Sequence, residues 1–173
     1  MKNKTAAVVA AIVLILLAAS LFISLKFNET NIALQQELLL KSQISLKVAD
    51  KEIMIGLNDI VSAEENFRAV LDTSVSSAKY HDYTGAQLKN ILINKNINIE
   101  NYDTVLLSGA DGFSAAYAAE EVIKDNNVYI AYKEDGNLLK SMDSGGSGPF
   151  LSIIVQDSFS NRRCKYLTKI EVK

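Results

Sequence analysis

The chain has 173 residues, and its 18 Lys and Arg residues nearly balance 20 Asp and Glu residues, for a formal net charge of −2. This balance lacks the basic surplus that neutralises nucleic-acid phosphates, so we expect no nucleic acid among its partners. One cysteine and one histidine exclude an intrachain disulfide framework and the multi-ligand sites of structural zinc, so we expect no metal site.

A long apolar run lies near the N-terminus. Residues 5–25 contain only aliphatic, aromatic and small side chains, and Lys2 and Lys4 precede them. A helix rises 1.5 Å per residue, so about 20 residues cross the roughly 30 Å hydrocarbon core of a membrane. We interpret residues 1–27 as an uncleaved transmembrane signal-anchor. The preceding lysines predict a cytoplasmic N-terminus, hence a single-pass protein of the cell membrane with an extracytoplasmic C-terminal domain.

Two other interpretations of this run stay open. The small residues at 18–20 would suit a signal peptidase, although the run is longer than the usual cleaved h-region of about 7–15 residues. A buried helix of a soluble protein is the remaining alternative. Residues 28–43 are interpreted as a polar stalk or linker, with a weak helical stripe through Ile32, Leu34 and Leu38.

Short elements of changing periodicity fill the first half of the remaining domain, residues 44–173. Alternating apolar residues at 44–48 and a renewed apolar run at 53–55 predict a hairpin. Thr84 is a plausible N-cap for a helix that presents Leu88 and Ile91 on one face. The expected elements are the hairpin over 44–55, a helix over 57–65, strands over 67–71 and 79–83 joined by a serine-rich turn at 73–77, and a helix from Thr84 through Leu92.

The second half contains further short strands. Gly109 and Gly112 bracket a tight hairpin turn, because glycine adopts positive φ without steric penalty. Many short strands without regular βαβ alternation predict an α+β fold with mixed β-sheets and short helices. The expected elements are strands over 104–108, 113–117, 128–133, 150–155 and 164–172, a helix over 118–123 and a flexible loop over 144–149.

Few side chains of this sequence suit catalysis, and we predict no catalytic residue. Glu120 and Glu121 are expected on a solvated helix face, and Asp111 in a turn, so they do not form a carboxylate pair. His81 is interpreted as a surface or hydrogen-bonded strand histidine. Cys164 is interpreted as a small buried residue, placed on the inner face of the last strand by alternation.

Five short segments between residues 45 and 173 occur in a characteristic order. They are YTGAQL at 83–88, SGADGFS at 108–114, VYIAYKEDG at 128–136, GP at 148–149 and KYLTKIEV at 165–172. In this order they resemble the oxidoreductase molybdopterin-binding domain, the fold of sulfite oxidase and of bacterial periplasmic methionine-sulfoxide reductases. The resemblance implies a sulfite oxidase-like fold, and it implies that Tyr83, Gly85, Tyr132, Gly148 and Lys165 are candidate ligand-binding residues.

The sequence departs from this family at the metal. Members that bind molybdenum supply a cysteine thiolate from an early part of a longer domain, and here no cysteine precedes Cys164. We therefore expect a short, divergent member without a cofactor. The predicted function is that of a non-catalytic binding or accessory module, which is anchored to the membrane by its N-terminal helix and takes an unknown small ligand or an extracytoplasmic protein partner. The alternative is a molybdopterin-cofactor-binding redox protein or a subunit of an oxidoreductase, and a purely structural surface protein is a third class.

Overall fold

The computed structural model describes residues 2–73 and 76–173, and it begins with one long helix. Helix α1, Lys2–Lys41, has 40 residues and contains neither Gly nor Pro. It is long and apolar enough to cross a membrane. The hydroxyl of Ser20 donates to the carbonyl of Leu17 at 2.8 Å, which satisfies that polar group within the helix. The helix also continues through most of the predicted stalk, and the chain divides into one compact unit that ends at Leu34 and a second that begins at Gln35.

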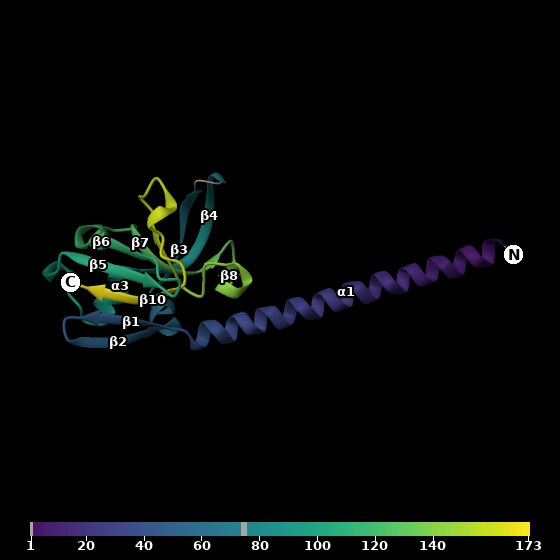
Figure 1. The fold of residues 1–173 in the computed structure, drawn as a ribbon, viewed down its shortest axis with the longest axis horizontal. Coiled ribbons are helices and arrows are strands. Elements are labelled where there is room, and N and C mark those ends of the chain that lie inside the picture. Colours follow the sequence, from purple (N-terminus) through teal and green to yellow (C-terminus); the bar gives the residue numbers. More distant parts are fainter. Residues whose placement is uncertain (1, 74–75) are drawn as a thin grey trace. The chain divides into compact units, whose positions relative to one another are not determined.

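The first sheet of the second unit has five strands (Figure 1). Strand β1 pairs with β10 in parallel, although the two lie at opposite ends of the domain sequence, and the other pairs are antiparallel. Alternation of buried and exposed residues along these strands turns one face of the sheet toward the core. In spatial order the strands are β2 (Lys51–Gly56), β1 (Gln43–Val48), β10 (Leu167–Val172), β5 (Thr104–Gly109) and β6 (Ser114–Ala118).

The second sheet is antiparallel and contains the longest strands. A register shift interrupts the pairing of β4 with β7 next to Gly85. A Cβ atom on Gly85 would lie 2.2 Å from the carbonyl oxygen of Ile130, so this close approach requires glycine. The strands are β3 (Glu64–Thr73), β4 (Ser76–Gln87), β7 (Val128–Glu134) and β8 (Asn137–Leu138), with β9 (Leu151–Ile154) also paired to β7.

Short helices and 3-10 turns connect the strands and help to close a large hydrophobic core. Its side chains come from both sheets and from the helices, for example Leu107, Ile130 and Leu88, all fully buried. A smaller cluster, which includes Tyr83, Ala131 and Ile153, forms a second core. The helical elements are α2 (Leu57–Val61), α3 (Leu88–Asn94), α4 (Ala119–Ile123), η1 (Ile99–Asn101), η2 (Met142–Ser144) and η3 (Ser160–Arg162).

Most predicted elements are present, but β3 and β4 extend beyond their predicted bounds by two to four residues at each end, and three further elements also differ. Thr84 is not a helix N-cap, because its hydroxyl donates to Asn66 at 2.9 Å across the β3–β4 pair and the strand continues to Gln87. The helix predicted over 57–65 ends at Val61, since Glu64 already pairs with β4. The serine-rich turn includes residues 74–75, which lie outside the described residues. The third difference concerns the last strand.

Strand β10 begins at Leu167, three residues later than predicted. Tyr166 adopts a left-handed φ of 50°, which interrupts an extended conformation just before the strand. Cys164 is buried as predicted, but it precedes the strand, so alternation along β10 is not the reason for its burial.

Candidate functional site

Residues 155–166 connect β9 to β10 and contact both halves of the domain; we call this segment the strap. Its neighbouring residues Arg162 and Arg163 carry guanidinium groups that bind different partners. Arg162 contacts helix α4, which directly follows β6 of the first sheet in the chain. Arg163 contacts the second sheet. The strap is thus fastened at two adjacent positions.

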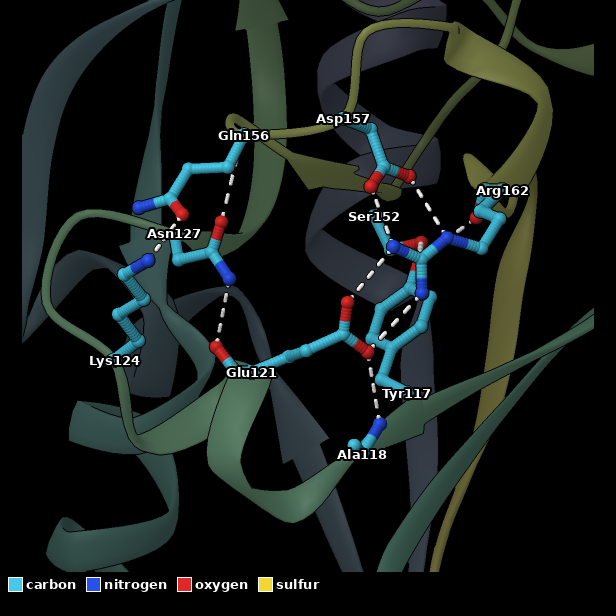
Figure 2. Close-up of polar contacts among 9 residues, drawn as sticks. All are labelled: Tyr117, Ala118, Glu121, Lys124, Asn127, Ser152, Gln156, Asp157 and Arg162. Carbon is cyan, nitrogen blue, oxygen red and sulfur yellow. Dashed lines mark hydrogen bonds and ion pairs between the residues drawn. The ribbon is translucent and has the colours of Figure 1, made fainter.

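Arg162 binds two carboxylates (Figure 2). Its Nη1 and Nη2 donate to the two oxygens of Glu121 at 3.1 and 2.8 Å, and its Nε donates to Asp157 at 2.9 Å. These bonds from Arg162 are the main reason why the pKa of Glu121 lies below its usual range, against the opposing effect of burial. Glu121 also accepts from the backbone N–H of Ala118 at 2.9 Å. Glu120 is exposed, as predicted, whereas Glu121 is only partly exposed and is bound by Arg162.

A buried hydroxyl relay lies next to this ion cluster. The Tyr117 hydroxyl donates to the carbonyl of Arg162 at 2.9 Å and lies 2.6 Å from the Ser152 hydroxyl, which accepts from the N–H of Cys164. Tyr117 and Ser152 are fully buried, and burial raises the pKa of Tyr117. The relay fixes the strap backbone at two points and leaves the tyrosine protonated at neutral pH.

An amide adds a further polar contact between helix α4 and the start of the strap. The Asn127 side chain donates to the carbonyl of Glu121 at 2.9 Å and accepts from the N–H of Gln156 at 3.3 Å. Lys124 donates to the Gln156 side chain at 2.5 Å. Figure 2 shows these contacts beside the Arg162 cluster. Together they join the first turn of the strap to the segment around α4.

Arg163 meets an aromatic surface instead of carboxylates. Its Nη1 donates to the Tyr83 hydroxyl at 2.9 Å, and that hydroxyl donates to Glu134 at 2.7 Å. Its Nη2 donates to the carbonyl of Val70, at the edge of β3. Burial is the main cause that raises the pKa of Tyr83. The ring of Phe67 stacks on Tyr83, with 5.6 Å between centroids.

The single histidine lies beside this group, on β4. Its Nδ1 is 2.8 Å from a carboxylate oxygen of Asp135 and 3.5 Å from Glu134. The pKa of Asp135 is lowered first by the N–H of Asp82 and then by His81. His81 is therefore a hydrogen-bonded strand histidine, as predicted. Within residues 2–73 and 76–173, no three His, Cys, Asp or Glu side chains converge as metal ligands.

Two hollows are open to solvent near these elements. The first, the polar pocket, has a volume of about 330 Å³ and lies on the β3–β4 hairpin. Arg68 at its wall faces the exposed ring of Tyr80 at 5.2 Å. The second is an apolar groove of about 480 Å³ whose isoleucines come from α3, from the connection between α3 and η1, from η1 and from α4. The polar pocket is lined by Asn66, Phe67, Arg68, Asp82, Tyr83, Thr84 and Gly136.

The five predicted ligand-binding residues do not share one site. Tyr83 lines the polar pocket, whereas Tyr132 belongs to the main core and its hydroxyl donates to Glu64. Gly85 is buried against Ile130. Gly148 is buried beside Leu139, before the cis peptide bond to Pro149. Lys165 is exposed.

Sequence reasoning missed the role of the strap. Arg162 and its partner Glu121 are 41 residues apart, and Arg163 and Tyr83 are 80 residues apart. The one available signal was the adjacent pair of arginines after a loop, which indicates charge but names no partner.

The only thiol of the chain is placed as a packing group. Cys164 is fully buried, and its Sγ lies 3.9 Å from the carbonyl of Phe113 and 3.8 Å from that of Lys165. Burial, assisted by the negative charge of Asp111, raises its pKa to about 12. A Cβ atom on Gly109 would lie 3.4 Å from this sulfur. A buried thiol that faces two carbonyl oxygens does not fit the cysteine thiolate with which the resembling family binds molybdenum.

The arrangement of strands and strap can be compared with solved structures. The chain shares its fold with part of one solved structure. It is similar to the sulfane dehydrogenase SoxCD from Paracoccus pantotrophus, with a TM-score of 0.63 and 13% sequence identity. The alignment covers 77% of this chain and 38% of the other, so the chain spans well under half of that protein. The predicted sulfite oxidase-like α+β fold is thereby confirmed. No protein-family model matches the sequence. No curated protein matches it either.

Proposed function

We propose that this protein is a membrane-anchored, extracytoplasmic binding module built on the sulfite oxidase-like scaffold, without molybdenum. The state of Cys164 carries the proposal. A molybdenum-ligating cysteine must present a thiolate to an open pocket, whereas this thiol is buried, faces two carbonyl oxygens and has a raised pKa. The alternative, a cofactor-binding redox protein, would need a ligand set that this chain does not place around its thiol.

The polar pocket supports a binding role. Its walls combine a guanidinium group, a carboxylate, an amide and a hydroxyl, from Arg68, Asp82, Asn66 and Thr84. Arg68 and Asp82 are mostly exposed and lie 3.8 Å apart, so both remain available to a ligand at little desolvation cost. This chemistry suits a small polar ligand with both donors and acceptors, next to the exposed aromatic ring of Tyr80.

The thiol can be tested directly. Full-length protein from a host that cannot make the molybdenum cofactor is treated with iodoacetamide between pH 6 and pH 9. We expect almost no alkylation of Cys164 until the protein is unfolded by denaturant, because the folded thiol is buried and protonated. Rapid alkylation of folded protein near pH 6 would instead reveal an accessible thiolate, and it would favour the redox alternative.

The topology has its own test. In the proposed topology α1 spans the membrane and the domain that follows Lys41 lies outside, so protease added to intact cells should remove that domain. Permeabilised cells provide the control for total accessibility. Complete protection in intact cells would reverse the orientation, and release of soluble protein cut near Ser20 would show a cleaved signal peptide.

A further inference from the structure

The polar pocket is formed by two neighbouring strands whose side chains differ in hydrogen-bonding character. Strand β3 brings the guanidinium of Arg68 and the amide of Asn66 to its wall, and β4 brings the carboxylate of Asp82 and the hydroxyl of Thr84. In the register of this hairpin Arg68 lies opposite Asp82, and Asn66 lies opposite Thr84. All four side chains share one face of the sheet, because alternate residues of a strand point to the same side. The wall therefore consists of two facing pairs.

A hydrogen bond orients the uncharged pair. The Thr84 hydroxyl donates to the amide oxygen of Asn66 at 2.9 Å. Because the single hydrogen of the hydroxyl is used in this bond, Thr84 presents lone pairs to a ligand and acts as an acceptor. Asn66 presents its NH₂ group and acts as a donor. Donors thus line the β3 side of the pocket, and acceptors line the β4 side.

The charged pair is close but not hydrogen-bonded. Arg68 Nε lies 3.8 Å from Asp82 Oδ1, beyond the roughly 2.7–3.2 Å of a hydrogen bond. Both side chains are mostly exposed, so their attraction is weak and a ligand separates them at little cost. The Arg68 guanidinium is held over the Tyr80 ring, 5.2 Å from its centroid. The backbone of Asp82 is fixed, since its N–H donates to the Asp135 carboxylate at 3.0 Å and its carbonyl accepts from the N–H of Asp135 at 2.7 Å.

We propose that the polar pocket binds a free α-amino acid in its zwitterionic form. The α-carboxylate accepts from Arg68 and Asn66 on β3, and the α-ammonium donates to Asp82 and Thr84 on β4. Asp82 would repel a simple anion and Arg68 would repel a simple cation, whereas a neutral sugar would pair with neither charge. This inference rests on the binding role proposed for the polar pocket, and it names the class of ligand.

The dimensions of the pocket agree with this ligand. A volume of about 330 Å³ lies at the lower end of the roughly 300–1,000 Å³ range of ligand pockets. The donors and acceptors lie on adjacent strands about 4.8 Å apart, and a free amino acid carries both of its charged groups on one carbon atom. A peptide carries its two terminal charges on different residues. The pocket therefore favours a free amino acid over a peptide.

Binding is tested on the full-length protein in detergent micelles, by isothermal titration with each of the twenty common L-amino acids. We expect at least one of them to bind. Its N-acetyl derivative lacks the ammonium and its amide lacks the carboxylate, so each should bind about tenfold more weakly after the loss of one charged interaction. No binding by any of the twenty at millimolar concentration would overturn the proposal. Equal affinities for the amino acid and both derivatives would also overturn it.

Two variants that remove one charge each should give a crossed pattern. Arg68→Gln should weaken binding of the amino acid about tenfold but leave its amide unaffected, because the amide has no carboxylate. Asp82→Asn should weaken binding of the amino acid to a similar extent but leave the N-acetyl derivative unaffected. Lys79→Gln, which removes an exposed cation of the same hairpin outside the pocket, should change none of these affinities. A variant that weakens all three ligands equally would contradict the assigned pairs.

Titration with glucose separates this inference from the broader binding role of the pocket. Binding of glucose that Arg68→Gln and Asp82→Asn both weaken, without binding of any amino acid, would overturn the zwitterion and keep the polar pocket as a binding site. The thermal midpoint of each variant is measured in parallel to show that it is folded. The comparison of the three ligands on the wild type needs no variant, so the proposal stays testable if a substitution prevents folding.

Discussion

The strap is attached to the rest of the domain by two sets of contacts, one made by Arg162 and one by Arg163, and these two fastenings differ in kind. Arg162 satisfies two carboxylates, Glu121 and Asp157, in a partly buried ion cluster. Arg163 donates to a tyrosine hydroxyl and a backbone carbonyl, beside stacked aromatic rings. Arg162 therefore neutralises negative charge, whereas Arg163 only completes hydrogen bonds, although both are arginines. Removal of the first should therefore cost more.

The largest effect is expected for Arg162→Met. This variant leaves the carboxylates of Glu121 and Asp157 facing each other without a cation. We expect a loss of about 2 kcal/mol in the free energy of unfolding, below the 3–5 kcal/mol of a fully buried pair because Arg162 is partly exposed. Denaturant unfolding measures it. Arg162→Lys keeps the positive charge but loses the two-pronged guanidinium, so its stability should lie between those of the wild type and Arg162→Met. An equal loss in Arg162→Lys and Arg162→Met would contradict the ionic account.

Tyr117→Phe tests the hydroxyl relay on the same side of the strap. The variant keeps the ring but leaves the buried Ser152 hydroxyl and the Arg162 carbonyl with one partner fewer. We expect a loss of about 1.5 kcal/mol in the free energy of unfolding. A matched control is Tyr102→Phe, which should matter little because Tyr102 is only partly buried. Equal stabilities of these two variants would show that water replaces the relay.

Arg163→Ala should have a smaller effect, about 1 kcal/mol. The Val70 carbonyl keeps its bond from Ser160, and the Tyr83 hydroxyl keeps its bond to Glu134, so neither group is left without a partner. Chemical denaturation of this variant beside Arg162→Met measures the difference between the two fastenings. If Arg163→Ala were the more destabilising, the aromatic side would be the principal attachment of the strap.

Lowering the pH should also distinguish the contacts of Arg162 from those of Arg163. This effect on stability is expected to be the smallest of the four. The folded pKa of Glu121 is lowered, so its contribution is complete above the unfolded value of about 4.3 and is lost as the pH falls through the folded value. Unfolding of the wild type between pH 5 and pH 3 should show this loss. Arg162→Met should make the slope of stability against pH shallower in that window, and Arg163→Ala should leave it unchanged; the lowered pKa values of Asp59, Asp135 and Glu171 keep part of the slope in every variant. Identical slopes in all three would contradict the assignment.

Local patterns in the sequence predicted the elements that depend on neighbours in the chain. The hairpins over β1–β2 and β5–β6 follow from alternation and glycine turns, and they were placed within one or two residues. Thr84 failed as a helix cap because its partner Asn66 is supplied by another strand. No local pattern records such a partner.

The candidate site was less predictable than the fold, for the same reason. The strap acts through contacts that cross most of the domain, and the resemblance pointed to Tyr83 but not to Arg163, which binds it. Tyr83 and Tyr132 both looked available to a ligand. A tyrosine ring is large and apolar with one polar tip, so it is equally suited to a core position. Here both rings are buried, and their hydroxyls donate to Glu134 and Glu64.

The central claim is that this scaffold works without molybdenum, and the metal content of the purified full-length protein tests it most directly. The protein is produced in a host that makes the cofactor, and molybdenum and released pterin are quantified beside Cys164→Ser. We predict neither molybdenum nor pterin in stoichiometric amount in either protein, because the only thiol is buried and protonated. Stoichiometric molybdenum in the wild type that disappears in Cys164→Ser would contradict the account.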